Sequence, residues 1–257
     1  MSPTVGGEAL NTEQAALCAH GEHELQAALH EHLGSAWGVD GGFASVDQSA
    51  PHPILFGGVT LEPEASGTQL ADVGGPVCDS FAVFTPEDMP GREADTSEMW
   101  MVRDAGLPAV EMPELDGVQI REAASMPEVE RWEAVSLIAN GAERGETGAL
   151  HPAASLGDPR LRFLQAEADG EVVGTALGMV GTETLTVSTV RVMPEARGRG
   201  IGRALTAAVL QLSSSLPATL SAMEMGRGIY QRLGFQDVGR PAHWTPVPAM
   251  ASLQAAH

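Results

Sequence analysis

The stretch VSTVRVMPEARGRGIGRALTAAVL, residues 187–210, decides the fold of this chain. Apolar and polar residues alternate from Leu185 to Val192, and the β-branched content predicts a strand. Pro194 ends that strand, an Arg/Gly-rich turn follows, and the apolar spacing from Ile201 onwards predicts a helix. A strand, a glycine-rich turn and a helix start together favour phosphate binding. The first helical N–H groups have no partner within the helix, and the helix dipole attracts anions.

The turn itself supplies the predicted anion-binding groups. Its glycines let a pyrophosphate approach the backbone, and its arginines add charge-assisted hydrogen bonds. A P-loop would need Gly-Lys-Ser/Thr, and this chain contains no lysine. A dinucleotide-binding fingerprint would open a longer βαβ array than the remaining chain can form. The predicted cradle consists of Arg197, Gly198, Arg199, Gly200, Ile201 and Gly202.

Two motifs carry a family resemblance. The pattern Arg-x-x-Gly-x-Gly after Met193-Pro194 strongly resembles the acyl-CoA-binding motif of the GCN5-related N-acetyltransferase (GNAT) family. About 28 residues downstream, the segment GIYQRLGF (228–235) resembles the late helix of that family, in which Gly-Phe follows a tyrosine by four residues. Tyr230 is the only tyrosine of the chain. The resemblance covers roughly residues 117–248.

The resemblance implies an α/β (α+β) GNAT fold, with a mixed, mostly antiparallel sheet flanked by helices. At 257 residues the chain is long enough for two domains. We therefore expect an acyl-CoA-binding GNAT domain at residues 116–257, preceded by a linker near 107–117. Residues 1–115 are predicted to be a degenerate, tandem GNAT-like domain, with an unrelated α/β extension shaping the acceptor pocket as the alternative.

The resemblance also implies a mechanism. The backbone of Val190, Arg191 and Val192 would pair with the pantetheine arm of acetyl-CoA or another acyl-CoA, where the strands before the glycine turn and before the tyrosine helix splay apart. An amine would attack the thioester directly, without a covalent enzyme intermediate, and Tyr230 would protonate the departing thiolate or hydrogen-bond to it. The predicted strand 218–223 offers no carboxylate to act as base. Glu224, His151, Asp158 and Glu183 stay open as candidates, none of them favoured.

Three functions stay open at this stage. The leading one is an acyl-CoA-dependent N-acyltransferase acting on a small-molecule amine. The second takes the acyl group from the phosphopantetheine of an acyl carrier protein, as in specialised metabolism, and Arg197 and Arg199 then dock the carrier. The third is a non-catalytic acyl-CoA-binding regulator. Dimers are common in the family, which leaves a homodimer open by analogy alone.

Composition limits the partners. Residues 1–115 hold 19 acidic residues and two arginines, a net charge of −17, whereas the remaining residues carry −3. This asymmetry suits an anionic cofactor and a cationic amine, although acidic residues also simply favour solubility. No basic stripe supports nucleic-acid binding, and no apolar run has the roughly 18 residues of a membrane span. Without a visible signal peptide we expect a cytoplasmic protein in which Cys18 and Cys78 are reduced and buried.

The remaining elements follow from periodicity and turn residues. One or two amphipathic helices are expected over 10–33, broken near Gly21, with their histidines solvated on the polar face and binding no metal. Asp169-Gly170 predicts a hairpin turn between strands 161–168 and 172–180. Further strands are expected at 52–61, 76–84, 98–103, 118–122, 218–223, 235–238 and 243–247, and helices at 126–140 and 226–233.

Overall fold

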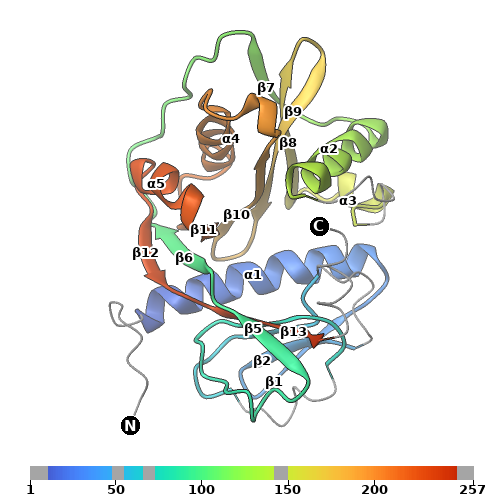
Figure 1. Ribbon diagram of the computed structural model, residues 1–257, viewed down its shortest axis with the longest axis vertical. Helices are drawn as coiled ribbons and strands as arrows, with labels where there is room; N and C mark the ends of the chain where they lie inside the picture. The colour runs from blue at the N-terminus through green and yellow to red at the C-terminus, as the bar shows by residue number, and fades with distance from the viewer. Residues whose placement is uncertain (1–10, 48–54, 66–72, 142–149, 248–257) are drawn as a thin grey trace.

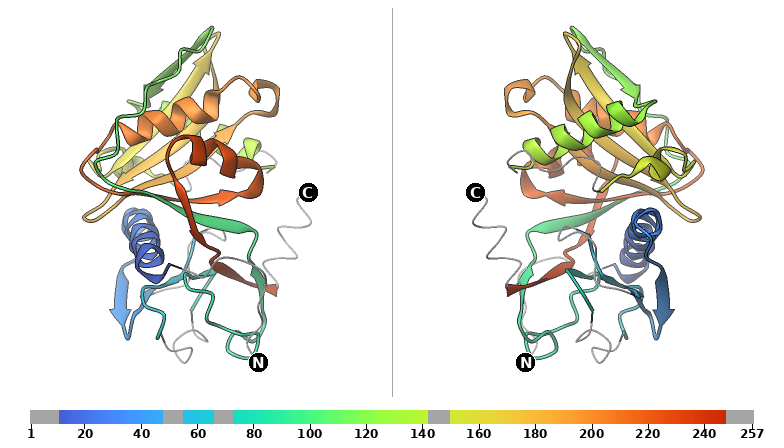
Figure 2. Two further views of the ribbon diagram at one scale, coloured as in Figure 1. Left: turned by 90° about the vertical axis from the view of Figure 1, so that its left-hand side faces the viewer. Right: turned by 90° about the vertical axis from the view of Figure 1, so that its right-hand side faces the viewer.

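A long helix lies between two β-sheets in the computed structural model, which describes residues 11–47, 55–65, 73–141 and 150–247 (Figures 1 and 2). This helix, α1 (Thr12–His32), crosses beneath a seven-stranded sheet and above a six-stranded one. Ala15, Cys18 and Ala19 of α1 are buried in a core that also contains side chains from both sheets. The two halves of the molecule therefore share one hydrophobic cluster along α1.

The seven-stranded sheet is mixed and mostly antiparallel. Its parallel pair consists of the central neighbours β10 (Leu185–Val192) and β11 (Ala218–Met223). Helices α4 (Ile201–Leu210) and α5 (Glu224–Arg232) pack on one face, and α1, α2 (Met126–Ala139) and the short α3 (Ala153–Leu156) lie on the other. This arrangement confirms the predicted fold class. The strand order is β12 (Gln236–Gly239), β6 (Glu98–Arg103), β11 (Ala218–Met223), β10 (Leu185–Val192), β9 (Glu171–Val180), β8 (Leu161–Ala168) and β7 (Val118–Glu122).

Local signals in the back half predicted its elements closely. Strands 118–122, 161–168, 185–192 and 218–223 have the expected bounds, and the helix expected at 126–140 ends one residue earlier. Asp169 and Gly170 both adopt positive φ, 52° and 83°, as the hairpin turn between β8 and β9 requires.

The six-stranded sheet is built mainly from the front half. Its order is β1 (Trp37–Asp40), β2 (Phe43–Val46), β3 (Gly58–Thr60), β4 (Val77–Asp79), β13 (Ala242–Pro246) and β5 (Arg92–Asp95). The expected strands 52–61 and 76–84 were too long, although residues 52–54 lie outside the described ranges. Strand β4 ends at Asp79 because this residue starts a turn: its carbonyl accepts from the Ala82 N–H and its carboxylate from the Phe84 N–H.

Each sheet contains one strand from the other half of the sequence. Strand β6 lies between β11 and β12, and its register with β11 runs without interruption from Glu98↔Met223 to Arg103↔Ala218. Conversely, β13 lies between β4 and β5. The domain boundary at 115/116 stays a prediction, as does the second, GNAT-like domain in the front half. Strands β6 and β13 each pair with strands from the other side of that boundary.

The predicted break of α1 near Gly21 was wrong. The helix is continuous, and a Cβ at Gly21 would lie only 2.6–2.7 Å from the hydroxyl oxygens of Thr184, Thr186 and Thr219. The glycine therefore permits close approach of the helix to β10 and β11 rather than ending the helix. The expectation of solvated histidines was also wrong for His30, which is buried and whose Nε2 lies 2.9 Å from the carbonyl oxygen of Phe56.

The cysteines, membrane-spanning helices and metal-binding clusters can each be checked in the structure. Cys18 and Cys78 are buried free thiols, as predicted. No helix among the described residues is long and apolar enough to cross a membrane. Within the same residues, no group of three or more histidine, cysteine, aspartate or glutamate side chains is arranged to hold a metal ion.

We predict that Gly21→Val lowers the free energy of unfolding by about 1–3 kcal/mol, because the new side chain must displace three short, stiff threonine side chains. Thermal and chemical denaturation measure this loss. The matched control is Gly38→Val in β1, where a Cβ would have no atom within 4 Å and where a β-branched residue suits the strand. Equal stability of the two variants would contradict the close packing of α1 on β10 and β11.

Candidate functional site

The turn between β10 and α4 has the backbone shape expected of an anion-binding loop. A single 3-10 turn, Pro194–Ala196, follows β10, and Gly198 and Gly200 then adopt φ of 78° and 82°. Gly200 is the N-cap of α4, and its left-handed conformation directs the chain into the helix at Ile201. A Cβ at Gly198 would meet no atom within 4 Å, so the space over this part of the turn is open.

The main-chain donors of this turn are unused. Among the described residues, no hydrogen bond from the N–H groups of Gly198 to Arg203 is found, and the first contact of α4 runs from the Ala204 N–H to the Gly200 carbonyl at 3.0 Å. Such a run of free N–H groups at the start of a helix, together with the positive end of the helix dipole, provides a site for an anion.

The strand that leads into this turn separates from its parallel neighbour. Strands β10 and β11 pair only at Leu185↔Ala218 and Thr186↔Thr219, whereas β11 stays paired with β6 along its whole length. Thr189 adopts a φ of 54°, and the register of β10 with β9 shifts between Ser188 and Arg191. This bulge rotates the end of β10, where Val190, Arg191 and Val192 are half-buried.

Both arginines of the turn contact main-chain oxygens. Arg197 donates from Nε to the Val192 carbonyl at 3.1 Å and from Nη2 to the Ala139 carbonyl at 3.3 Å. Arg199 donates from Nη2 to the Asp116 carbonyl at 3.0 Å. These bonds connect the turn to β10, to the end of α2 and to the segment before β7. The predicted contact of both guanidinium groups with a pyrophosphate stays a prediction.

Tyr230 lies on α5, and its side chain packs against the face of the seven-stranded sheet that carries α4. Its ring is half-buried and contacts Phe235 edge-on, with centroids 6.1 Å apart. Burial raises the pKa of the Tyr230 phenol, the positive charge of Arg191 lowers it, and the negative charge of Glu98 raises it. The phenol therefore keeps its proton at neutral pH and can donate it.

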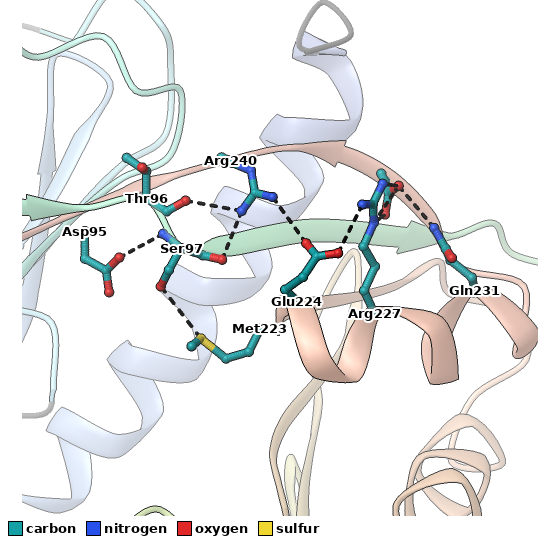
Figure 3. A network of polar contacts seen from close by, with 9 residues as sticks. Asp95, Thr96, Ser97, Met223, Glu224, Arg227, Gln231 and Arg240 are labelled. Atoms are coloured by element: carbon teal, nitrogen blue, oxygen red, sulfur yellow. Dashed lines mark hydrogen bonds and ion pairs between the residues drawn. The ribbon is translucent and has the colours of Figure 1, made fainter. Parts of the chain in front are cut away.

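Three of the four open base candidates are occupied or remote from this opening. Asp158 is buried and paired with Arg160 at 2.6 Å and His32 at 2.9 Å. Although burial raises the pKa of Asp158, hydrogen bonds from Arg160 and His32 lower it to about 2. Glu224 is paired with Arg227 at 3.6 Å and Arg240 at 3.4 Å (Figure 3). Glu183 is exposed in the turn between β9 and β10.

The fourth candidate, His151, belongs to a buried pair. Its Nδ1 lies 3.0 Å from a carboxylate oxygen of Glu133, and its ring contacts Trp132 and Phe163 edge-on. Glu133 also accepts hydrogen bonds from the Leu150 and His151 N–H groups. The pair joins the segment before α3 to α2.

One carboxylate near the opening was missed by the sequence analysis. Glu98, the first residue of β6, is half-buried and accepts a hydrogen bond from the Ser221 hydroxyl of β11. The strand 98–103 was predicted, but nothing in its sequence places it beside β11. The four base candidates predicted from the sequence all come from the back half, so Glu98 was not among them.

The fold and the site define an α/β protein with an anion-binding turn between two diverging strands. Residues 159–237 match the acetyltransferase (GNAT) domain family. This segment contains β8 to α5, the turn and Tyr230. The match covers less than half of the chain, and the GNAT fold implies acyl transfer from acyl-CoA to an amine-type acceptor.

Three solved structures resemble most of the chain. A GCN5-related N-acetyltransferase from Kribbella flavida has a TM-score of 0.61 and 17% identity, covering 90% of this chain and 96% of that one. An acetyltransferase of the GNAT family from Novosphingobium aromaticivorans has a TM-score of 0.55 and 19% identity, covering 86% of this chain and 97% of that one. A GCN5-related N-acetyltransferase from Sphaerobacter thermophilus has a TM-score of 0.52 and 18% identity, covering 89% of this chain and 92% of that one. At these identities the likeness concerns the fold. A search of curated proteins finds no match.

We predict that Asp158→Asn destabilises the protein at pH 7. The lowered pKa means that the carboxylate stabilises the fold above pH 4 and loses this effect as the pH falls toward about 2. The loss on substitution should be about 2 kcal/mol at pH 7 and should shrink toward zero near pH 2. Denaturation at several pH values measures it, and a variant whose deficit stays constant with pH would contradict this role.

Proposed function

We propose that this protein is an N-acyltransferase that moves an acyl group from the thioester of acyl-CoA directly to the amine of a small molecule. The observation that carries the proposal is the juxtaposition of a row of unused N–H groups and a strand edge that no neighbouring strand pairs with. The N–H groups are those of Gly198 to Arg203, and the edge is the end of β10 beyond its last pair with β11. A pyrophosphate suits the first set, and an extended chain carrying amide groups suits the second.

The residues present fit acetyl-CoA or another acyl-CoA. The N–H groups of the turn would hold the pyrophosphate, and Arg197 and Arg199 at its two ends would add positive charge. The backbone of Val190, Arg191 and Val192 would pair with the pantetheine arm as an added strand does. When bound, acyl-CoA would supply the activated acyl group. The N–H groups that would hold its pyrophosphate include those of Gly198, Gly200, Ile201 and Gly202.

Tyr230 is the acid in this proposal. Its phenol keeps its proton at neutral pH because burial raises its pKa, and its ring lies on the face of the sheet that carries α4 and α5. A proton donated from this position to the leaving sulfur would prevent the thiolate from attacking the product again. A positioned acid contributes about 10²–10⁴-fold to the rate.

Direct transfer needs positioning more than a nucleophile. Holding an amine and a thioester in attack geometry supplies roughly 7–11 kcal/mol of the barrier. Cys18 of α1 and Cys78 of β4 are buried in the core between α1 and the six-stranded sheet. Burial raises the pKa of both thiols well above the ordinary range. Neither thiol suits a covalent intermediate.

We predict that Tyr230→Phe keeps its affinity for acetyl-CoA and loses about 10²–10⁴-fold in kcat. Calorimetry measures the binding, and release of the CoA thiol in the presence of a panel of primary amines measures the rate. Unchanged turnover would contradict the acid role. Thiol release only from an acetylated carrier protein would instead favour the carrier as donor, and tight binding of acetyl-CoA without any turnover would favour a regulator.

We predict separately that Gly202→Val weakens acetyl-CoA binding at least tenfold without lowering the melting temperature. A Cβ at Gly202 would lie 3.8 Å from Val192 Cγ2 and 3.9 Å from Val190 Cγ1, so a valine would fill the space between the turn and β10. Calorimetric titration with acetyl-CoA checks this, and Gly38→Val is the control. Full affinity in the Gly202 variant would place the cofactor elsewhere.

A further inference from the structure

The proposed reaction requires a base that the GNAT segment does not provide. An alkylamine has a pKa near that of lysine, about 10.4, so only on the order of 1 in 10³ molecules is neutral at pH 7. Of the four candidates in the back half, two are held in ion pairs, one is exposed at a remote turn, and one is buried against α2. The carboxylate at the opening comes from β6.

Glu98 lies level with the end of β11. It pairs in register with Met223, four residues beyond the last contact of β11 with β10 at Thr219. Its position on β6 is therefore beside the part of β11 that has lost its parallel neighbour. The Ser221 hydroxyl donates to the Glu98 carboxylate and holds it there.

Glu98 and Tyr230 approach this opening from opposite faces of the sheet. Side chains alternate along a strand, so Glu98 shares a face with Trp100, which packs in the α1 core. Tyr230 packs against the other face, together with Leu220 and Ala222 of β11. The two side chains therefore flank the end of β11 on its two faces, and the charge of Glu98 raises the pKa of the Tyr230 phenol.

A second carboxylate lies behind Glu98. Glu22, one turn along α1 from Cys18, follows the glycine that contacts Thr186 and Thr219. Burial raises the pKa of Glu22 to about 7; a hydrogen bond from Gln26 lowers it, and the charge of Glu98 raises it further. The α1 side of the sheet therefore carries two carboxyl groups that interact with each other, whereas the free N–H groups lie across the sheet at the start of α4.

We propose that Glu98, supplied by the front half of the chain through β6, is the general base that accepts the proton of the acceptor amine, and that the acceptor enters as an alkylammonium ion from the α1 side. This inference rests on the proposed function. The titratable and charged groups around Glu98 come from several elements: Glu22 of α1, Cys78 of β4, Tyr230 of α5, His243 of β13 and Arg240 of the turn before β13.

The proton balance is complete with these two side chains. The Glu98 carboxylate first takes one proton from the ammonium ion and passes it to solvent, and the neutral nitrogen then forms the new C–N bond with the thioester carbon. The electron pair of the breaking C–S bond leaves with sulfur. The nitrogen gives its second proton to the Glu98 carboxylate as Tyr230 gives a proton to sulfur, and the proton on Glu98 restores Tyr230 through solvent. The products are an amide and a thiol.

The test compares Glu98→Gln with Glu98→Asp and with the control Glu183→Gln, an exposed carboxylate at the turn between β9 and β10. Glutamine keeps the shape of the side chain and an oxygen for the Ser221 hydroxyl, so the fold should be retained, as circular dichroism checks. Acetyl-CoA affinity is measured by calorimetry. Thiol release from acetyl-CoA is then followed with benzylamine, putrescine, aniline and water as acceptors.

We expect Glu98→Gln to bind acetyl-CoA as the wild type does and to lose about 10²–10⁴-fold in kcat with the alkylamines, with partial recovery in Glu98→Asp. The loss should be smaller with aniline, which is already neutral at pH 7 and needs less help from a base. A purely structural role would affect both amine classes equally.

The outcomes separate the two proposals. If the wild type binds acetyl-CoA and releases thiol while Glu98→Gln turns over at the wild-type rate, Glu98 is not the base and the proposed function stands. An equal loss with benzylamine and aniline, without recovery in Glu98→Asp, also overturns the inference. A wild-type protein that binds no acetyl-CoA, or releases no thiol with any of the four acceptors, overturns the proposed function and the inference with it.

Discussion

The site depends on one constraint, the early separation of β10 from β11. Two residue pairs hold these parallel strands together, and beyond Thr186 and Thr219 the neighbouring edges no longer pair with each other. Strand β11 remains straight because β6 pairs with all six of its residues. Strand β10 turns away because Thr189 adopts a positive φ and introduces a bulge opposite β9. An unpaired strand edge must bond to water or to a ligand, and here it leads directly into the free N–H groups of the turn.

Helix α1 supports that separation from below. Its glycine contacts the threonines of β10 and β11 at the level where the two strands still pair, so the helix lies against the base of the opening. The same helix packs Ala15 and Cys18 against the front sheet. Substitutions on either face of α1 should therefore change the packing of β10 and β11 at the site, although no residue of α1 belongs to the matched GNAT segment.

Sequence reasoning located the structural elements whose signals are local. The turn 197–202, the tyrosine helix and the Asp169-Gly170 hairpin each lie within a few residues of the features that predict them. It failed where tertiary packing decides. Gly21 was expected to break a helix because glycine is a poor helix former, but three threonine hydroxyls require a residue without a side chain at that position. His30 was expected to be solvated, and burial beside Phe56 cannot be inferred from periodicity.

The exchange of β6 and β13 explains why the base could not be found in the back half alone. Strand β6 was recognisable from EMWMVR, but a strand's own sequence does not specify a partner in a distant part of the chain. Once β6 lies between β11 and β12, Glu98 lies opposite Met223, beyond the last contact of β11 with β10, and Arg240 donates to the neighbouring Ser97 carbonyl at 2.9 Å (Figure 3). The front half contributes a strand to the seven-stranded sheet and is therefore part of the same structural unit as the back half. If residues 1–115 were removed, β11 would lose its antiparallel partner, α1 would no longer support β10, and the carboxylate beside the opening would be gone; the smallest unit able to carry the proposed chemistry is therefore the two interleaved halves together.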